Sequence, residues 1–129
     1  MSLLISRQVW SAEAATATKT FLATSPQLDL VISAIITVEP SSFTGTLDFQ
    51  GKSEGGTYTN LAYAELDQDG AARGFTNDQI TLTTDSTRRR YLIPFVENLN
   101  QIVMTRSAGT ISAWITGSGV PLAATDTVV

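Results

Sequence analysis

Apolar and polar side chains alternate along much of this chain, which is the pattern of half-buried β-strands. The longest apolar run shares one face and consists of Leu28, Leu30, Ile32, Ala34, Ile36 and Val38. A second alternating run covers residues 43–50, and the glycine-containing stretch 52–56 separates it from a Thr- and Tyr-rich run at 57–66. This order predicts a β-hairpin.

The second half of the chain repeats this pattern. Four further strands are predicted, at residues 80–83, 90–96, 101–107 and 111–116. The short glycine-containing link at 107–110 predicts a hairpin between the last two. Because Pro94 has no backbone N–H, it places its strand at a sheet edge, at a bulge.

About eight short strands without a long helical period predict an all-β fold, an antiparallel β-sandwich of the jelly-roll type with extended terminal arms. A length of 129 residues fits one domain. We expect an N-terminal arm or the first strands at 1–23, the sandwich core at 24–117 and a C-terminal arm or tail at 118–129. The stretch 11–15 could equally begin a short helix.

Composition restricts the chemistry. The chain has no cysteine and no histidine, which removes disulfides, thiolate metal sites and the commonest general base. We therefore expect a protein that is not an enzyme, with no catalytic residues, no metal site and no cofactor. The net charge of −4 argues against nucleic-acid binding. Residues 1–7 do not read as a signal peptide and no run is long enough for a membrane span, so we expect synthesis in the cytoplasm and no membrane partner.

Acidic residues offer two candidate sites, both of low specificity. Asp67-Gln68-Asp69-Gly70, with Glu65 upstream, matches a fragment of a calcium loop but lacks its closing glutamate, so a plain turn is favoured. Carboxylate pairs for glycoside hydrolysis can be drawn among Asp48, Glu54, Glu65 and Asp67. No flanking positioning groups support such a pair.

Aromatic and basic residues offer two binding candidates. A sugar-stacking platform would use Trp10, Trp114, Tyr58, Tyr63 and Tyr91, although aromatic rings at strand spacing more often serve as core or interface anchors. The run 88–90 is the chain's one cluster of arginines. On an extended chain Arg88 and Arg90 point together and Arg89 points away. The favoured interpretation is a solvated strand entrance that protects an edge. The alternative is a partner-binding role, in which Arg88 and Arg90 contact carboxylates of a neighbouring subunit.

The order of these strands and turns resembles the small β-sandwich accessory proteins of tailed-bacteriophage virions, among them capsid decoration or cement proteins and related head and tail modules. The likeness covers roughly residues 44–117. It rests on Phe49-Gln50-Gly51, on the stretch Gly55-Gly56-Thr57-Tyr58-Thr59-Asn60-Leu61, and on residues 91–96, 101–106 and 109–117. The first 40 residues match no part of this pattern.

The resemblance implies a virion structural protein, most specifically a decoration protein on the capsid exterior that binds and stabilises the major capsid protein lattice. A homo-oligomer is expected, and a trimer is favoured because capsid lattices offer three-fold positions. The alternative function is a carbohydrate-recognition module of a tail or surface protein.

Overall fold

The structure is a computed structural model that describes residues 3–20, 30–52, 56–67, 73–94 and 99–119. Every regular element in these ranges is a β-strand, and every strand pair is antiparallel. The strands are β1 (Leu3–Glu13), β2 (Ala17–Thr20), β3 (Leu30–Lys52), β4 (Tyr58–Asn60), β5 (Ala64–Leu66), β6 (Ile80–Asp85), β7 (Arg89–Ile93) and β8 (Gln101–Gly119). The predicted all-β antiparallel class is therefore confirmed.

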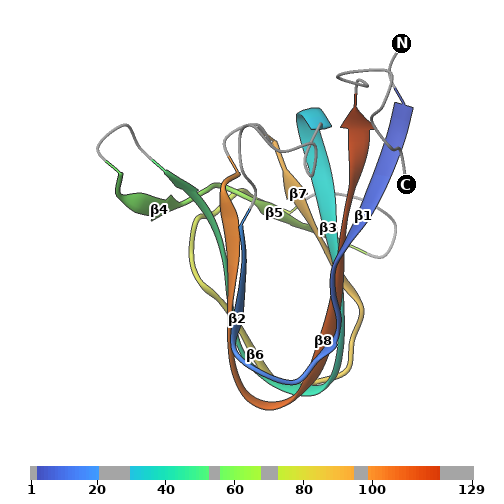
Figure 1. The fold of residues 1–129 in the computed structure, drawn as a ribbon, viewed down its shortest axis with the longest axis vertical. Helices are drawn as coiled ribbons and strands as arrows, with labels where there is room; N and C mark the ends of the chain where they lie inside the picture. The colour runs from blue at the N-terminus through green and yellow to red at the C-terminus, as the bar shows by residue number, and fades with distance from the viewer. Residues whose placement is uncertain (1–2, 21–29, 53–55, 68–72, 95–98, 120–129) are drawn as a thin grey trace.

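Two long strands, β3 and β8, form the spine of a single eight-stranded sheet. They pair along their length, from Leu30 opposite Gly119 to Gln50 opposite Gln101. Midway, the sheet folds over into a U, so that its two halves face each other (Figure 1). The first half has the order β1-β8-β3-β7-β5; in the second half β2 flanks β8, and β4 and β6 flank β3. The two layers of this fold thus come from one continuous sheet.

Three local predictions change with this architecture. Residues 101–107 and 111–116 belong to one strand, β8, so the predicted hairpin at 107–110 is wrong; the chain bends there without reversing. Pro94 lies just after β7 and not in an edge strand, because β7 ends at Ile93 and pairs with both β3 and β5. Residues 11–13 are the end of β1, so of the two alternatives at 11–15 the strand is present and the short helix is not.

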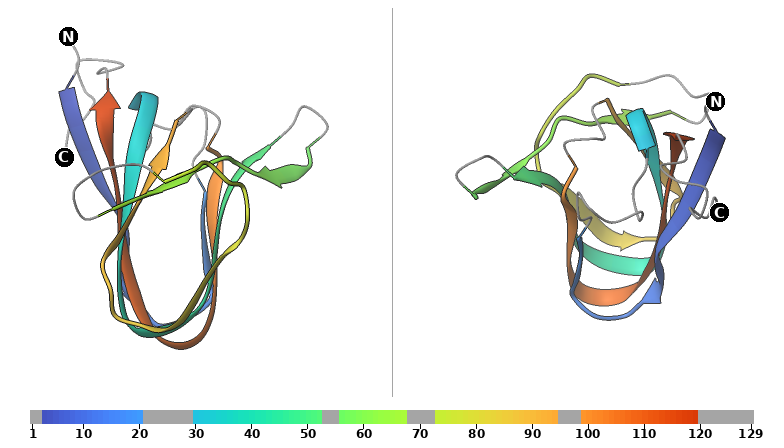
Figure 2. Two further views of the ribbon diagram at one scale, coloured as in Figure 1. Left: turned by 180° about the vertical axis from the view of Figure 1, so that it is seen from behind. Right: turned by 45° about the horizontal axis from the view of Figure 1, so that its top comes forward.

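The predicted hairpin after residue 52 is present, since β3 pairs with β4 from Gln50 opposite Asn60 to Lys52 opposite Tyr58. Figure 2 shows this hairpin projecting to one side of the U. The domain limits at 23/24 and 117/118 stay predictions, and residues 120–129 lie outside the described ranges.

The bend is a row of irregular positions on four strands. Ala12, Ser42, Thr84 and Gly109 each have a positive φ, on β1, β3, β6 and β8 respectively. The strand register shifts beside the first three, as it does at β-bulges. Bulges bend a strand and increase its twist, so a row of them folds the whole sheet.

Side-chain hydroxyl groups accept hydrogen bonds from backbone N–H groups at this bend. The N–H of Ala12 donates to Ser112 Oγ at 2.8 Å, and the N–H of Ser42 donates to Ser86 Oγ at 2.9 Å. The N–H of Thr84 donates to the hydroxyl of Thr44, also at 2.9 Å. Each of the three non-glycine residues in the left-handed region therefore has a replacement for the ladder bond that the bulge removes.

The core lies between the two halves of the sheet. Its largest fully buried side chains come from both halves: Tyr91, Phe43, Phe49, Ile36, Leu47, Ile93, Ile102, Met104, Ile111, Ile115 and Val38. Near the open end, the ring of Tyr63 lies 5.5 Å from that of Phe49 and 5.6 Å from that of Tyr91, edge-on to both. Since Phe49 belongs to the second half and Tyr91 to the first, this aromatic cluster joins the two halves.

We predict that Gly109→Ala destabilises the fold by about 2 to 4 kcal/mol. Gly109 has φ of 75°, and a Cβ there would overlap the carbonyl group of Ser42 on the neighbouring strand. Equilibrium urea unfolding measures the change. Gly74→Ala is the matched control, because a Cβ at Gly74 meets nothing within 4 Å. Equal unfolding midpoints for the two variants would contradict this account of the bend.

Candidate functional site

The outer face of the first half carries the side chains available to a partner. Along β8, Ala113 and Ile115 are buried, so Trp114 between them points outward. Trp114 lies opposite Thr37 of β3, which in turn lies opposite Arg90 of β7. One row of paired positions therefore crosses three strands on this face.

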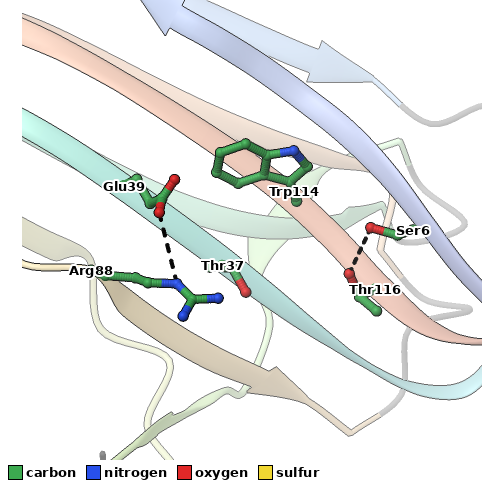
Figure 3. A pocket seen from close by; sticks show the side chains of 6 residues that line it. All are labelled: Ser6, Thr37, Glu39, Arg88, Trp114 and Thr116. Atoms are coloured by element: carbon green, nitrogen blue, oxygen red, sulfur yellow. Dashed lines mark hydrogen bonds and ion pairs between the residues drawn. The ribbon is translucent and has the colours of Figure 1, made fainter.

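Trp114 borders a hollow of about 250 Å³, which we call the Trp114 hollow. Its lining consists of Ser6, Thr37, Glu39, Arg88, Trp114 and Thr116, drawn from β1, β3, β8 and the residue before β7 (Figure 3). The hydroxyls of Ser6 and Thr116 are hydrogen-bonded at 2.9 Å. Arg88 Nε lies 3.9 Å from Glu39 Oε1, a long ion pair between exposed side chains. The hollow thus combines one aromatic ring with three hydroxyls, a carboxylate and a guanidinium.

The predicted pair Arg88 and Arg90 comes together in a second hollow, which we call the arginine hollow. It has a volume of about 470 Å³ and is lined by Leu66, Asp67, Thr87, Arg88 and Arg90. Arg90 is partly engaged, because its Nη2 donates to the backbone oxygen of Asp67 at 3.1 Å. Arg88 lines both hollows.

Arg89 points away from this pair, as strand alternation predicts. Its Nε donates to Asp85 Oδ2 at 2.7 Å, and its Nη1 donates to Glu65 Oε2 at 3.1 Å. Asp85, at the end of β6, is the buried charged residue among those described. Burial alone would raise the pKa of the Asp85 carboxyl, but the hydrogen bonds from Arg89 and Thr87 outweigh burial and lower this pKa below its usual value. This network joins β5, β6 and β7.

The five aromatic rings do not form one sugar-stacking platform, and three of them are core anchors, the role that aromatic rings at strand spacing more often serve. Trp10, Tyr63 and Tyr91 are buried in the core. Burial raises the pKa of the Tyr91 hydroxyl, which has no hydrogen-bond partner among the described residues. Trp114 and Tyr58 are the two remaining rings, and they lie on β8 of the first half and on β4 of the projecting hairpin. Trp114 borders a hollow with polar lining.

The candidate carboxylates are held in separate structural contacts. Asp48 accepts hydrogen bonds from the side-chain amides of Asn60 and Gln79, at 3.1 and 2.7 Å. Glu65 pairs with Arg89, and Asp67 pairs with Arg73 at 2.6 Å. Glu54 and Asp69 lie outside the described ranges. Among the described residues no group of three possible metal ligands is present, and no helix there is long and apolar enough to cross a membrane.

Sequence reasoning missed Ser6, Thr37, Glu39 and Thr116 as neighbours of Trp114. The sequence gives only a weak indication of this proximity, because each of these residues occupies an ordinary outward-facing position on a strand. The register that aligns β1, β8 and β3 brings them together, for example Ser6 opposite Thr116.

Comparison with known proteins gives one informative likeness. No family model matches the sequence, and no curated protein matches it. The crystal structure of the SPBc2 prophage-derived protein YomS matches the fold with a TM-score of 0.63 and 11% sequence identity. The match covers 92% of this chain and 96% of that one. At this identity the likeness shows a shared fold over nearly the whole chain.

We predict that the Asp85–Arg89 contact makes the fold sensitive to acid. A lowered pKa in the folded state means that the contact stabilises the protein above about pH 4 and that this stability is lost as pH falls through the folded pKa. Thermal unfolding followed from pH 7 to pH 2 should therefore show a steeper acid decline for the natural chain than for Asp85→Asn. An identical acid decline in both proteins would contradict the assignment.

Proposed function

We propose that this chain is a non-enzymatic structural protein of a tailed-phage virion, most specifically a decoration protein on the exterior of the capsid. The observation that carries the proposal is the fold shared, over 92% of the chain, with a prophage-derived protein. The resemblance of residues 44–117 to virion accessory proteins points to the same class. The major capsid protein lattice is the proposed partner, and a symmetric oligomer, a trimer by the lattice argument, is the proposed assembly.

The physical properties of the fold suit this role. A protein that clamps a lattice needs a fixed shape and an outer surface able to dock, and it needs no titrating nucleophile. The row of bulges fixes the curvature of the sheet, and the aromatic cluster joins its two halves. The outer face of the first half supplies exposed positive charge at Arg88, whose side chain is 65% exposed. Arg88 and Arg90 are the proposed partner contacts.

Added to capsids that lack it, the purified protein should bind at a fixed number of copies and raise the temperature at which the particles break. The reason is that a protein binding only the intact lattice stabilises that lattice by mass action. Copy number from gel densitometry and particle disruption by scanning fluorimetry measure the two effects. Absence of binding, or binding without a constant stoichiometry, would remove the decoration assignment.

Replacing Arg88 and Arg90 together by Ala should slow association with capsids roughly three- to tenfold at low salt and flatten its salt dependence. Long-range attraction between charges acts mainly on the rate of encounter, so the melting temperature of the isolated protein should change little. Association rates measured by light scattering at two salt concentrations test this.

Lys19→Ala combined with Lys52→Ala is the matched control, since it also removes two positive charges, from β2 and from the end of β3, in the other half of the sheet. If this double lysine variant slows association as much as the double arginine variant, net charge and not the arginine hollow governs the encounter.

A further inference from the structure

The two tryptophans of this chain differ in where their side chains point. Trp10 is 7% exposed and belongs to the core, whereas Trp114 points outward from β8. The Trp114 hollow lies next to its indole ring. An aromatic ring beside a hollow offers an apolar surface on which a flat or chair-shaped ligand can stack.

The polar groups around the ring suit a ligand that carries many hydroxyls. Hydroxyl groups of Ser6, Thr37 and Thr116 can both donate and accept hydrogen bonds. Glu39 adds acceptors, and the guanidinium of Arg88 adds donors. Figure 3 shows Glu39 and Arg88 on one side of Trp114 and the Ser6–Thr116 pair on the other. The ligand would thus have an apolar face over the indole and polar groups around its rim.

The charge and the size of the hollow restrict the class of ligand further. Glu39 and Arg88 carry opposite charges and lie 3.9 Å apart, so the hollow favours a ligand without net charge. A volume of about 250 Å³ is below the roughly 300 to 1,000 Å³ of sites for drug-sized ligands, so the hollow has room for about one sugar ring.

The side chains of the hollow stand on paired strands, with Ser6 opposite Thr116 and Thr37 opposite Trp114. Few groups need ordering on binding, which lowers the entropic cost. The exposed Arg88–Glu39 pair contributes little to stability, so either side chain can turn to a ligand hydroxyl at low cost.

We propose that the Trp114 hollow binds one neutral hexopyranose unit of a polysaccharide, stacked on the indole of Trp114 and hydrogen-bonded by the surrounding hydroxyl, carboxylate and guanidinium groups. A ligand of this size binds a shallow site with a dissociation constant of about 1 mM. Many copies on one particle would add avidity for a polysaccharide surface. This binding function goes beyond lattice attachment and does not depend on it.

The test uses the full-length protein and four probes: glucose, galactose, mannose and N-acetylglucosamine. Each is titrated to about 100 mM, roughly a hundred times the expected constant. The readout is the pair of indole N–H signals in the proton NMR spectrum. We expect at least one sugar to shift the Trp114 signal in a saturable manner while the signal of buried Trp10 stays in place.

Two variants make the result specific. Trp114→Ala should weaken sugar binding at least tenfold, measured by saturation-transfer NMR on the sugar protons, and Trp114→Phe should retain part of the binding because it keeps a ring. Lys19→Ala is the control that leaves sugar binding unchanged, because Lys19 lies on β2 in the other half of the sheet and does not line the Trp114 hollow. A melting temperature for each variant separates lost binding from lost folding.

Three outcomes would overturn the proposal. They are no shift of the Trp114 signal with any of the four sugars, equal shifts of both indole signals, and undiminished binding by folded Trp114→Ala. If no sugar binds and Trp114→Ala abolishes capsid binding, the hollow is part of the lattice interface. If sugars bind while capsids do not, the sugar site stands and the decoration assignment fails.

Discussion

Hydrogen bonds between backbone N–H groups and side-chain hydroxyls at the bend of the sheet are the interactions on which this structure depends. A continuous sheet of long strands cannot fold over without breaking its ladder, and each broken backbone bond is costly if the group stays unpaired. Here Ser112, Ser86 and Thr44 accept the N–H groups that the bulges release. The abundant serine and threonine of this chain thereby have a structural use: they allow one sheet to form both layers.

The bend also decides which side chains face outward. It turns one face of each half inward, where Ile36 and Ile115 are buried, and leaves the opposite face of the first half free to carry Trp114 and Thr37. The same alternation separates the three arginines. Arg89 holds Asp85 and Glu65 within the fold, while Arg88 and Arg90 stay on the outer face.

The sheet edges formed by β1 and β2 disfavour pairing with a strand of another chain. Among the described strands, β1 and β2 border β8 and have no second neighbour. Each carries a basic residue at a position opposite a buried one: Arg7 opposite Ile115, and Lys19 opposite Ile102. Charged residues on the inward side of an edge strand oppose pairing with another chain. Contacts through the outer face therefore suit this molecule better than pairing along the β1 and β2 edges.

The sequence by itself determined the all-β class, most strand positions, the hairpin after residue 52 and the opposite directions of Arg89 and its two neighbours, because alternation with a period of two is a local property. It did not determine that residues 101–107 and 111–116 form one strand. A glycine in a short polar link is equally compatible with a turn and with a bulge, and the choice depends on pairing with β3, which is distant in the chain. The Trp114 hollow likewise could not be predicted from the local sequence pattern. Ser6, Glu39, Arg88 and Trp114 meet because the register of β1, β8, β3 and β7 aligns them, and register is fixed by the packing of the whole core.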